Sequence, residues 1–380
     1  MPNLVDIVEL AEALESKAVY VAADRCVVVR NRNAKCRKCV RACPTSAVTV
    51  QGNAVSIDAG ACVACGACTT VCPTEALIPL DPLDDDLAAR IAGACVASGG
   101  TAAFACARIA SKRQGDPDKF AEVPCLARME ESVLLGVAAR GIDDIVLVDG
   151  TCATCKFRAC EPGIDATVAS ANDLLAVQGS PVRIRRASEF PDNVLLEDER
   201  RLFGAARRGF FTQAKSVAKD AAGTAVEVAL KKNAAAPSLR ERLKMSDSGT
   251  LPQFNAARRM NVLDAMDVLG TPVEPELATR LWGSVEVDAE ACSACGMCTV
   301  FCPTGALRKS DVEQEGGEGD YLEFSLADCV QCNVCADICL KQCLRVNSTI
   351  STEELFDFEP RLIPIPKKKA RTGFLSSLKR

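Results

Sequence analysis

The most constraining feature of the sequence is a repeated pattern of cysteines. The chain has 23 cysteines in 380 residues, and most of them fall in four closely spaced groups. Two groups have the pattern C-x2-C-x2-C-x3-C-P, one beginning at Cys62 and the other at Cys292. Each has a companion group, which lies upstream of the first and downstream of the second. Two cysteine-rich modules, residues 22–80 and 284–347, therefore bracket the rest of the chain.

The spacing indicates iron–sulfur cubane clusters rather than zinc or disulfides. A [4Fe–4S] cube needs four soft thiolate ligands around a compact inorganic core, and a C-x2-C-x2-C loop supplies three of them from one turn. The fourth comes from a distant cysteine that is followed by proline. Small residues between the ligands, such as Ala64 and Gly66, let backbone N–H groups approach the sulfur atoms. A structural zinc site normally pairs two separated C-x2-C knuckles and does not need the third cysteine.

Composition excludes several other chemistries. The chain has no histidine, which rules out Rieske-type ligation, histidine general-base catalysis and mixed Cys/His zinc sites. The stretch from Met1 to Tyr20 lacks a signal-peptide pattern, and no segment approaches the ~20 apolar residues of a membrane span. We therefore expect a cytoplasmic protein, in which disulfides are rare. The net charge of −5 gives no reason to expect a nucleic-acid partner.

The two modules resemble the bacterial dicluster ferredoxin family, in which each cube takes its fourth ligand from the other motif. The resemblance implies four [4Fe–4S] clusters in this chain. In the N-terminal module it implies one set formed by Cys62, Cys65, Cys68 and Cys43, and a second formed by Cys36, Cys39, Cys72 and Cys26. In the C-terminal module it implies one set formed by Cys292, Cys295, Cys298 and Cys339, and a second formed by Cys329, Cys332, Cys335 and Cys302.

The chain departs from the family pattern at two of these ligands. The loop from Cys26 to Cys36 is longer than the two-residue spacing of the family, although loop-closure entropy grows slowly enough to allow the insertion. Cys339 lacks the usual proline, and Cys343 follows four residues later. We interpret Cys339 as the ligand and Cys343 as a bystander.

Between the modules, residues 84–190 alternate between helical and strand patterns. Helices are predicted over Asp84–Ala97, Met129–Arg140 and Asp165–Val177, and strands over Thr101–Cys106, Phe120–Cys125, Asp144–Asp149 and Pro181–Arg185. This alternation is typical of a small parallel α/β domain. The predicted fold is therefore a multidomain α/β and α+β chain, with two ferredoxin-like dicluster modules flanking a parallel α/β domain.

Further cysteines gather at the predicted strand ends of this middle domain. Cys106, Cys125 and Cys152 each lie at or just after the C-terminal end of a strand, and Cys155 and Cys160 follow closely. Ligand sites of open parallel sheets lie outside those strand ends. We predict a fifth metal site with Cys106, Cys125, Cys152 and Cys155 as ligands and Cys160 as an additional candidate.

The middle domain is similar to the delta subunit of methyl-viologen-reducing hydrogenase. The resemblance rests on Phe104–Cys106, Val123–Arg128, Gly136–Gly150 and Cys152–Phe157. Members of that family pass electrons between a hydrogenase or formate dehydrogenase and a heterodisulfide-reductase flavoprotein. The resemblance implies a [2Fe–2S] or similar cluster here. The alternative is a redox dithiol, because Cys152-Ala-Thr-Cys155 has thioredoxin spacing.

The remaining segments complete the predicted organisation. Residues 1–82 form the N-terminal module with a leading helix, and residues 200–280 form a helical connector with a linker. Residues 348–380 are predicted to be a basic tail, in which Lys367, Lys368, Lys369 and Arg371 precede apolar residues. This tail could bind an acidic partner or make peripheral contact with an anionic membrane, or it could be a solvated tail.

These patterns predict an electron-transfer subunit that relays electrons between larger redox enzymes. A hydrogenase, a formate dehydrogenase or a flavoprotein of anaerobic metabolism would be the partner. The sequence has no Gly-rich phosphate loop, so no flavin or nucleotide cofactor is predicted, and no catalytic acid–base residues stand out. Two alternatives remain: an oxidoreductase with a catalytic dithiol or open cluster at Cys152 and Cys155, and a structural or redox-sensing iron–sulfur protein.

Overall fold

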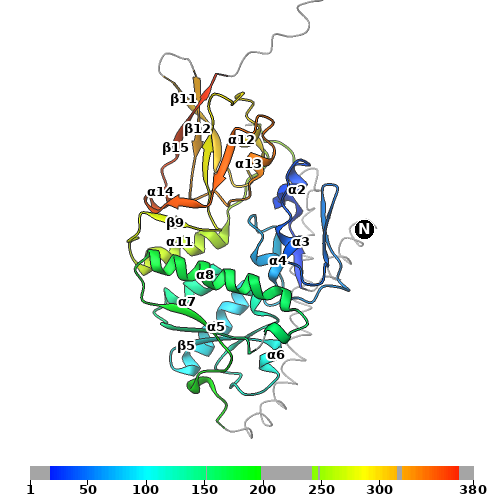
Figure 1. Ribbon diagram of the computed structural model, residues 1–380, viewed down its shortest axis with the longest axis vertical. Helices are drawn as coiled ribbons and strands as arrows, with labels where there is room; N and C mark the ends of the chain where they lie inside the picture. The colour runs from blue at the N-terminus through cyan, green and yellow to red at the C-terminus, as the bar shows by residue number, and fades with distance from the viewer. Residues whose placement is uncertain (1–17, 151, 198–241, 247–248, 315–318, 368–380) are drawn as a thin grey trace, which may run out of the picture.

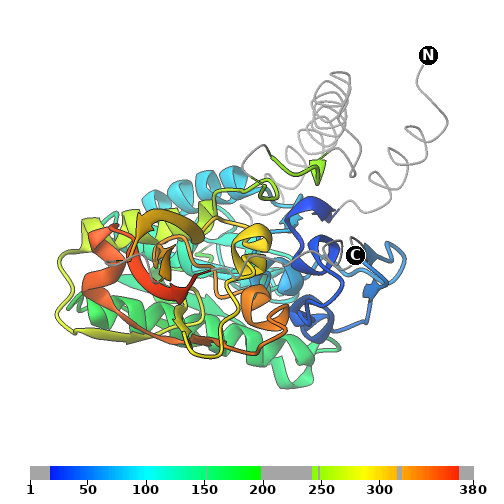
Figure 2. The ribbon, with the colours of Figure 1, turned by 90° about the horizontal axis from the view of Figure 1, so that it is seen from above.

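The computed structural model describes residues 18–150, 152–197, 242–246, 249–314 and 319–367. Figure 1 shows the central α/β part at one end of the long axis and the C-terminal module at the other. The N-terminal module lies beside both, and Figures 1 and 2 both place it next to the C-terminal module. The two cysteine-rich modules, which are far apart in sequence, are therefore neighbours in space.

The N-terminal module consists of short elements around its cysteine loops. Two helices flank the first cysteines, α2 (Val27–Arg30) and α3 (Lys38–Ala42), and α4 (Ala67–Thr70) follows the second loop. Two antiparallel pairs cover them: β1 (Val19–Val21) with β4 (Leu77–Pro79), and β2 (Val48–Gln51) with β3 (Ala54–Ile57). Because these elements are so short, the small core of Val19, Val48 and Leu77 packs directly against cysteines.

The central part contains a parallel four-stranded sheet, as the sequence predicts, with the strands in the order β6-β5-β7-β8. The strands are β5 (Thr101–Cys106), β6 (Ala121–Val123), β7 (Asp144–Val148) and β8 (Arg183–Ala187). Its helices are α5 (Asp84–Ser98), α6 (Ala107–Ala110), α7 (Glu131–Ala138) and α8 (Glu161–Val177), with short 3-10 turns at Leu126–Arg128, Cys152–Thr154, Arg158–Cys160 and Asp192–Val194.

Both faces of this sheet are buried, which explains its nearly continuous apolar strands. Phe104 and Leu147 belong to the large core that also contains residues of α5, α7 and α8. The alternate residues Ala105 and Val146 pack on the other side with Phe190 and neighbouring loop residues. The turn Leu126–Arg128, which follows β6, contacts α4, so the carboxyl edge of the sheet and its cysteines lie next to the N-terminal module.

The C-terminal module has more regular structure than the N-terminal one. Its pairs are β9 (Glu276–Ala278) with β14 (Thr349–Ser351) and β10 (Ser284–Val287) with β13 (Leu344–Asn347). A three-stranded antiparallel sheet follows, formed by β11 (Leu307–Glu313), β12 (Gly319–Phe324) and β15 (Arg361–Pro366). The helices are α12 (Met297–Phe301), α13 (Val334–Asp337) and α14 (Thr352–Asp357).

Two parts of the predicted organisation differ from the structure. The sequence predicts a basic tail over residues 348–380, but residues up to Pro366 fold, because β14 and β15 pair with β9 and β12. The predicted connector, residues 200–280, ends in α11 (Ala257–Leu269), which packs against α7 and α8 of the central part. The connector helix predicted over Ala205–Lys232 and the tail after Lys367 lie outside the described residues.

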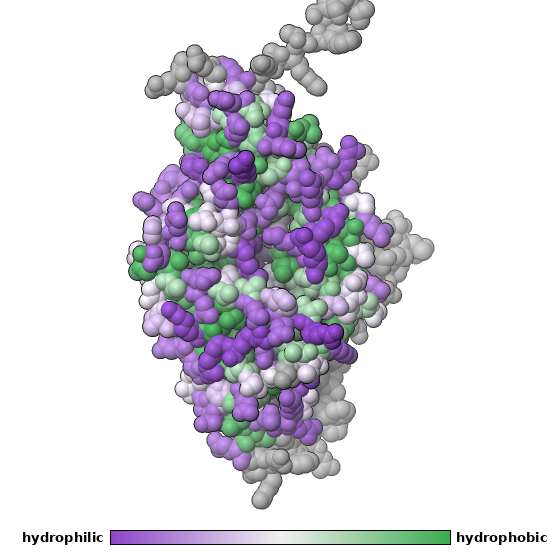
Figure 3. Space-filling view, in the orientation of Figure 1, coloured by the Kyte–Doolittle hydropathy of each residue, from purple (hydrophilic) through white to green (hydrophobic). Residues whose placement is uncertain are grey.

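Among the described residues, no helix has the length and apolar character needed to cross a bilayer. The face shown in Figure 3 carries small groups of apolar residues interspersed among hydrophilic ones.

Candidate metal centres

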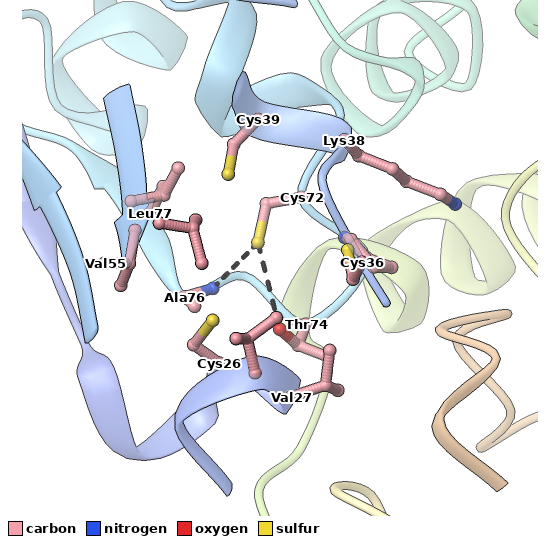
Figure 4. A pocket seen from close by; sticks show the side chains of 13 residues that line it. Cys26, Val27, Cys36, Lys38, Cys39, Val55, Cys72, Thr74, Ala76 and Leu77 are labelled. Atoms are coloured by element: carbon pink, nitrogen blue, oxygen red, sulfur yellow. Dashed lines mark hydrogen bonds between the residues drawn. The ribbon is translucent and has the colours of Figure 1, made fainter. Parts of the chain in front are cut away.

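The structure brings the cysteines of the N-terminal module together as two groups of four. The first group, site A, consists of Cys26, Cys36, Cys39 and Cys72, which line one pocket together with aliphatic residues. Figure 4 shows the sulfur atoms of Cys26, Cys39 and Cys72 facing into this pocket. The long segment between Cys26 and Cys36 contains α2, which turns the chain back on itself. The insertion therefore does not remove Cys26 from the site.

The second group, site B, consists of Cys43, Cys62, Cys65 and Cys68, which line a second pocket. Cys43 comes from the first half of the module and the other three come from the second half. The structure therefore has the crossed arrangement that the ferredoxin resemblance implies.

The C-terminal module repeats this arrangement. Site C consists of Cys302, Cys329, Cys332 and Cys335, which line a pocket beneath β11 and β13. Site D consists of Cys292, Cys295, Cys298 and Cys339. Burial raises the pKa of Cys298 to about 12, and the thiolates of Cys295, Cys292 and Cys339 act in the same direction. All four cysteines of site D therefore lie close together.

Three of the cysteine loops share an unusual backbone conformation around their middle ligand. Ala64, Ala294 and Gln331 precede that ligand with φ of 56°, 51° and 51°. Gly66 and Gly296 follow it with φ of 77° and 75°. Left-handed residues on both sides of one cysteine bend the chain around its sulfur atom, and glycine adopts this conformation without strain. This conformation explains the glycines of the first two loops, and in the third loop Gln331 and Asn333, with φ of 51° and 63°, adopt the same conformation.

In each of the four sites one ligand, the crossing ligand, comes from the other half of its module: Cys43, Cys72, Cys302 or Cys339. Hydroxyl groups lie next to the first three of these crossing ligands. In each Cys-Pro-Thr segment the threonine Oγ1 lies near the cysteine Sγ, at 3.7 Å from Cys43, 3.8 Å from Cys72 and 3.9 Å from Cys302. At Cys72 the backbone N–H of Ala76 also donates to Sγ, at 3.3 Å (Figure 4). Donors of this kind stabilise a negatively charged sulfur ligand.

Cys339 has a different neighbour. No threonine follows it, and its Sγ lies 3.4 Å from the Sγ of Cys343. Cys343 is buried and also forms a side-chain hydrogen bond with Cys292, which raises its pKa together with burial and Cys339. The residue predicted to be a bystander is thus in contact with two cysteines of site D.

The thiols of these sites need cations to be stable as thiolates. Burial raises the pKa of Cys39 to about 12 and of Cys329 to about 11, and neighbouring thiolates contribute to both shifts. Burial also raises the pKa of Cys335, and four neighbouring thiolates add to it. Metal binding removes this penalty, because a coordinated thiol is deprotonated. The donor sets therefore fit a cationic iron–sulfur core.

The spacing of the sulfur atoms favours a polynuclear cluster over a single metal ion. Within the described residues, no three cysteine, aspartate or glutamate side chains converge closely enough to hold one ion. A tetrahedral zinc site with bonds of about 2.3 Å would bring its sulfur atoms to about 3.8 Å from one another. None of the four groups, as described, therefore meets the requirement of a single tetrahedral ion.

A buried arginine gives a second indication that the residues around site B fit an iron–sulfur cluster. Arg128 is 1% exposed, and its Nη2 donates to Pro82 O and to Asp84. Its Nε and Nη1 are buried and have no hydrogen-bond partner among the described protein atoms. A Cβ on Gly66 would lie 2.8 Å from Arg128 Cα, so this arginine packs against the ligand loop of site B. Unpaired buried donors are costly, and sulfide atoms of a bound cluster would supply acceptors.

The five predicted thiols of the middle domain form a further group, the central site, at the carboxyl edge of the sheet. Burial raises the pKa of Cys106, and the Cys125 and Cys155 thiolates raise it further. Burial raises the pKa of Cys152 to about 12, with Asp149 and Cys125 among the contributors. The backbone N–H of Phe157 donates to Cys155 Sγ at 3.4 Å. The structure thus places these thiols near one another at the strand ends, and a metal site formed by them stays a prediction.

Cys160 has a larger place in this arrangement than the sequence suggested. It is buried at the start of α8, and its thiol lies beside the thiols of Cys125 and Cys65, which, followed by burial, raise its pKa. The interaction with the Cys160 thiol is the main reason that the pKa of Cys125 falls to about 7. Cys160 therefore links the central site to site B. The sequence contained no signal for this contact, because it depends on how two separate modules pack.

Sites A, B and C are also adjacent to one another. Burial raises the pKa of Cys68 in site B, and Cys39 of site A is among the thiolates that raise it further. Burial likewise raises the pKa of Cys332 in site C, and Cys36 of site A contributes. Site A is therefore the neighbour of both site B and site C.

Site D completes the row. Cys298 of site D is among the thiolates that raise the pKa of the buried Cys335 in site C. Cys295 of site D is exposed. The five groups therefore follow one another in the order central site, B, A, C and D, and the row reaches the surface at Cys295 of site D.

Comparison with known proteins agrees with the two outer modules. Residues 32–76 and 291–343 match the family model of the 4Fe-4S dicluster domain. The chain thus contains two dicluster ferredoxin-type modules, as predicted, and a role in iron–sulfur electron transfer is supported. No curated protein and no solved structure matches the chain significantly. The resemblance of the central part to the hydrogenase delta subunit stays a prediction.

Proposed function

We propose that this protein is an electron relay that holds four [4Fe–4S] clusters at sites A to D and a fifth iron–sulfur cluster at the central site. Such clusters accept and release single electrons at potentials set by hydrogen bonds, charge and exposure. The observation that carries the proposal is the continuous row of thiol groups. Cys36 and Cys332 are close enough to influence each other across the boundary of the two modules.

The residues of each site have separable tasks in this proposal. The cysteines hold the metal, and the Cys-Pro-Thr hydroxyls and nearby N–H groups stabilise the charge on the sulfur ligands. Aliphatic side chains such as Val28 and Leu77 limit the access of water to site A. Arg128 supplies positive charge beside site B.

The two ends of the row are the proposed points of exchange with partner enzymes. At site D, Met297, between Cys295 and Cys298, is 38% exposed, and Leu340, directly after Cys339, is 89% exposed. At the other end, Cys152 and Cys155 lie in a half-buried surface loop. We propose a hydrogenase or formate dehydrogenase and a heterodisulfide-reductase-like flavoprotein as the two partners, on the resemblance of the central part.

The central site separates this proposal from its main alternative, a catalytic dithiol. The dithiol predicted from the sequence consists of Cys152 and Cys155, and Cys125, whose pKa the neighbouring Cys160 lowers to about 7, is a further candidate thiol for it. A lowered pKa is typical of a reactive thiol. The same contact serves a relay equally well, because it joins the central site to site B.

A double variant, Cys152→Ser with Cys155→Ser, tests the choice. Under the relay proposal, the anaerobically purified full chain loses one paramagnetic species and about two to four irons, while the four cubane signals persist. Serine hydroxyl is a harder and less acidic donor than thiol, so it should empty only this site. Cys95→Ala is the matched control, since Cys95 lies in the α5 core.

Unchanged iron content and spectra in the double variant would contradict a cluster at the central site. Reduction of a small disulfide by the unaltered protein, lost in Cys125→Ser, would support the dithiol instead. Cys160→Ser cannot serve as a neutral control, because its side chain contacts both Cys125 and Cys65.

A further inference from the structure

Arg30 belongs to the N-terminal module, but its side chain lies at the cysteines of the C-terminal module. It is the last residue of α2 and is 7% exposed. Its Nη1 donates to Asp24 O at 3.1 Å and to Pro252 O at 2.8 Å. The second contact joins residues far apart in sequence, so the position of Arg30 depends on the packing of the two modules.

The segment around Pro252 runs along one ligand of site C. The N–H of Leu251 donates to Val300 O at 3.1 Å, and the N–H of Phe254 donates to Pro303 O at 3.0 Å. These two bonds hold Pro252 against the stretch that contains Cys302. A guanidinium bonded to Pro252 O is therefore close to that ligand.

The contact between α2 and the C-terminal module is well packed. Val27 and Val28 share a buried apolar cluster with Val334 and Ile338, and Cys36 and Cys332 pack against it. The backbone N–H of Lys35 donates to Asp337 Oδ2 at 2.8 Å. These contacts leave little freedom for the side chain of Arg30.

Two of the three nitrogen atoms in the guanidinium of Arg30 have no hydrogen-bond partner among the described protein atoms. Its Nε and Nη2 are buried and make no hydrogen bond with the described protein atoms. Burial lowers the pKa of Arg30, and the Cys302 and Cys332 thiolates oppose this effect ahead of Asp24. Two cysteines of site C are thus the negative groups that act most strongly on Arg30.

Site C has few cations of its own. The ligand segments 299–305 and 329–338 contain no lysine or arginine. The cations near it come from elsewhere: the buried Arg30, the half-buried Lys38 of the N-terminal module, and the buried Arg259 of α11, whose Nη2 donates to Val330 O at 3.5 Å. A buried, negatively charged group is stable only when it is paired with positive charge or donors.

We propose that Arg30 serves site C. Its Nε and Nη2 donate hydrogen bonds to the sulfur atoms of the cluster held at site C, and Arg30 thereby sets the reduction potential of that cluster. This inference rests on the proposed function, because it requires a cluster at site C. It means that the C-terminal module is incomplete by itself. Donors and positive charge stabilise the more negative, reduced form, so Arg30 raises the potential.

The test compares three variants of the full chain, purified anaerobically. Arg30→Met removes both charge and donors, Arg30→Lys keeps the charge with a different donor geometry, and Arg32→Met is the matched control because Arg32 is exposed two residues away. Iron and sulfide are counted for each, and each cluster is titrated by electron paramagnetic resonance. The signal missing in Cys332→Ser identifies the cluster of site C.

We expect full iron in all three variants, a lower midpoint potential for the site C cluster alone in Arg30→Met, a smaller decrease in Arg30→Lys, and no change in Arg32→Met. Full iron with an unchanged site C potential in Arg30→Met would overturn this inference and leave the proposed function standing. A shift in the potentials of all clusters together would overturn it as well, since it would indicate a change in the whole fold rather than an effect at site C. Absence of a site C cluster from the unaltered chain would refute both proposals.

Discussion

At the residue scale, site D differs from the other sites at the position four residues after its crossing ligand. Ala47, Ala76 and Ala306 occupy this position after Cys43, Cys72 and Cys302, whereas Cys343 occupies it after Cys339. The preceding residues Ser46, Glu75, Gly305 and Gln342 all have positive φ, so the four segments share one backbone path. Cys343 thus takes the place of a small packing residue, with a thiol in contact with the ligand.

We expect Cys343→Ala to retain full iron, because it restores the residue found at the other three sites. Only the potential of the site D cluster should decrease, since one weak S–H donor is lost. Cys339→Ala should instead impair site D. Iron counts and redox titration of the two variants decide whether Cys339 or Cys343 is the fourth ligand of site D. Loss of a cluster in Cys343→Ala but not in Cys339→Ala would identify Cys343 as the ligand.

Lys38 gives a second residue-scale prediction. It lines site A, and Figure 4 shows its side chain extending away from Cys39 and Cys72. Burial lowers its pKa, while Cys36 of site A and Cys332 of site C oppose that effect. We expect Lys38→Met to lower the midpoint potentials of both clusters, A and C. The exposed Lys35 provides the control, because water screens an exposed charge: Lys35→Met should change neither potential, and an equal shift in both variants would refute the assignment.

At the element scale, α11 joins the three parts of the molecule. Arg258 Nε lies 2.8 Å from Glu130 Oε2, and its Nη1 donates to Thr69 O at 2.8 Å. Arg259 pairs with Glu75 at 3.7 Å and donates to Leu281 O at 2.8 Å. The helix therefore binds the N-terminal module, the central α7 region and the C-terminal module through two consecutive arginines.

We expect Arg258→Met to destabilise the protein by about 3–5 kcal/mol, because Glu130 is left buried without its partner. Burial raises the pKa of Glu130, and Arg258 opposes that rise. Without Arg258 the folded state binds a proton more readily than the unfolded state, so stability falls as pH rises. Urea unfolding at several pH values measures this, with the exposed Met260→Ala as control. A cost that is small or grows toward low pH would contradict the pairing.

The sequence predicted local elements well and the packing between them poorly. Alternation of apolar patterns located β5 and β7, and the strand-end rule placed Cys106, Cys125 and Cys152 together, because both depend on nearby residues. The contact of Cys160 with Cys65 and the approach of Arg30 to site C depend on the packing of separate modules. The folding of residues 349–366 was also missed, because those short strands are stabilised by partners distant in sequence.

At the scale of the whole molecule, the account depends on an uninterrupted row of clusters. Four cubane clusters and one smaller or equal cluster correspond to about 18–20 irons per chain. We expect anaerobically purified protein to contain this amount with matching acid-labile sulfide. A value near eight, or bound zinc in place of iron, would contradict the ligand sets.

The most direct measurement is the magnetic interaction between neighbouring clusters in the fully reduced chain. Site C lies between sites A and D, so the account predicts that Cys332→Ser removes one cluster and the interaction-broadened features of cluster D. The broadening of cluster A should decrease but not vanish, because the interaction between A and B persists. Cys95→Ala should leave the spectrum unchanged. If the signals of A and D in Cys332→Ser equal those of the unaltered chain, the two modules do not exchange electrons through adjacent clusters and the relay is contradicted.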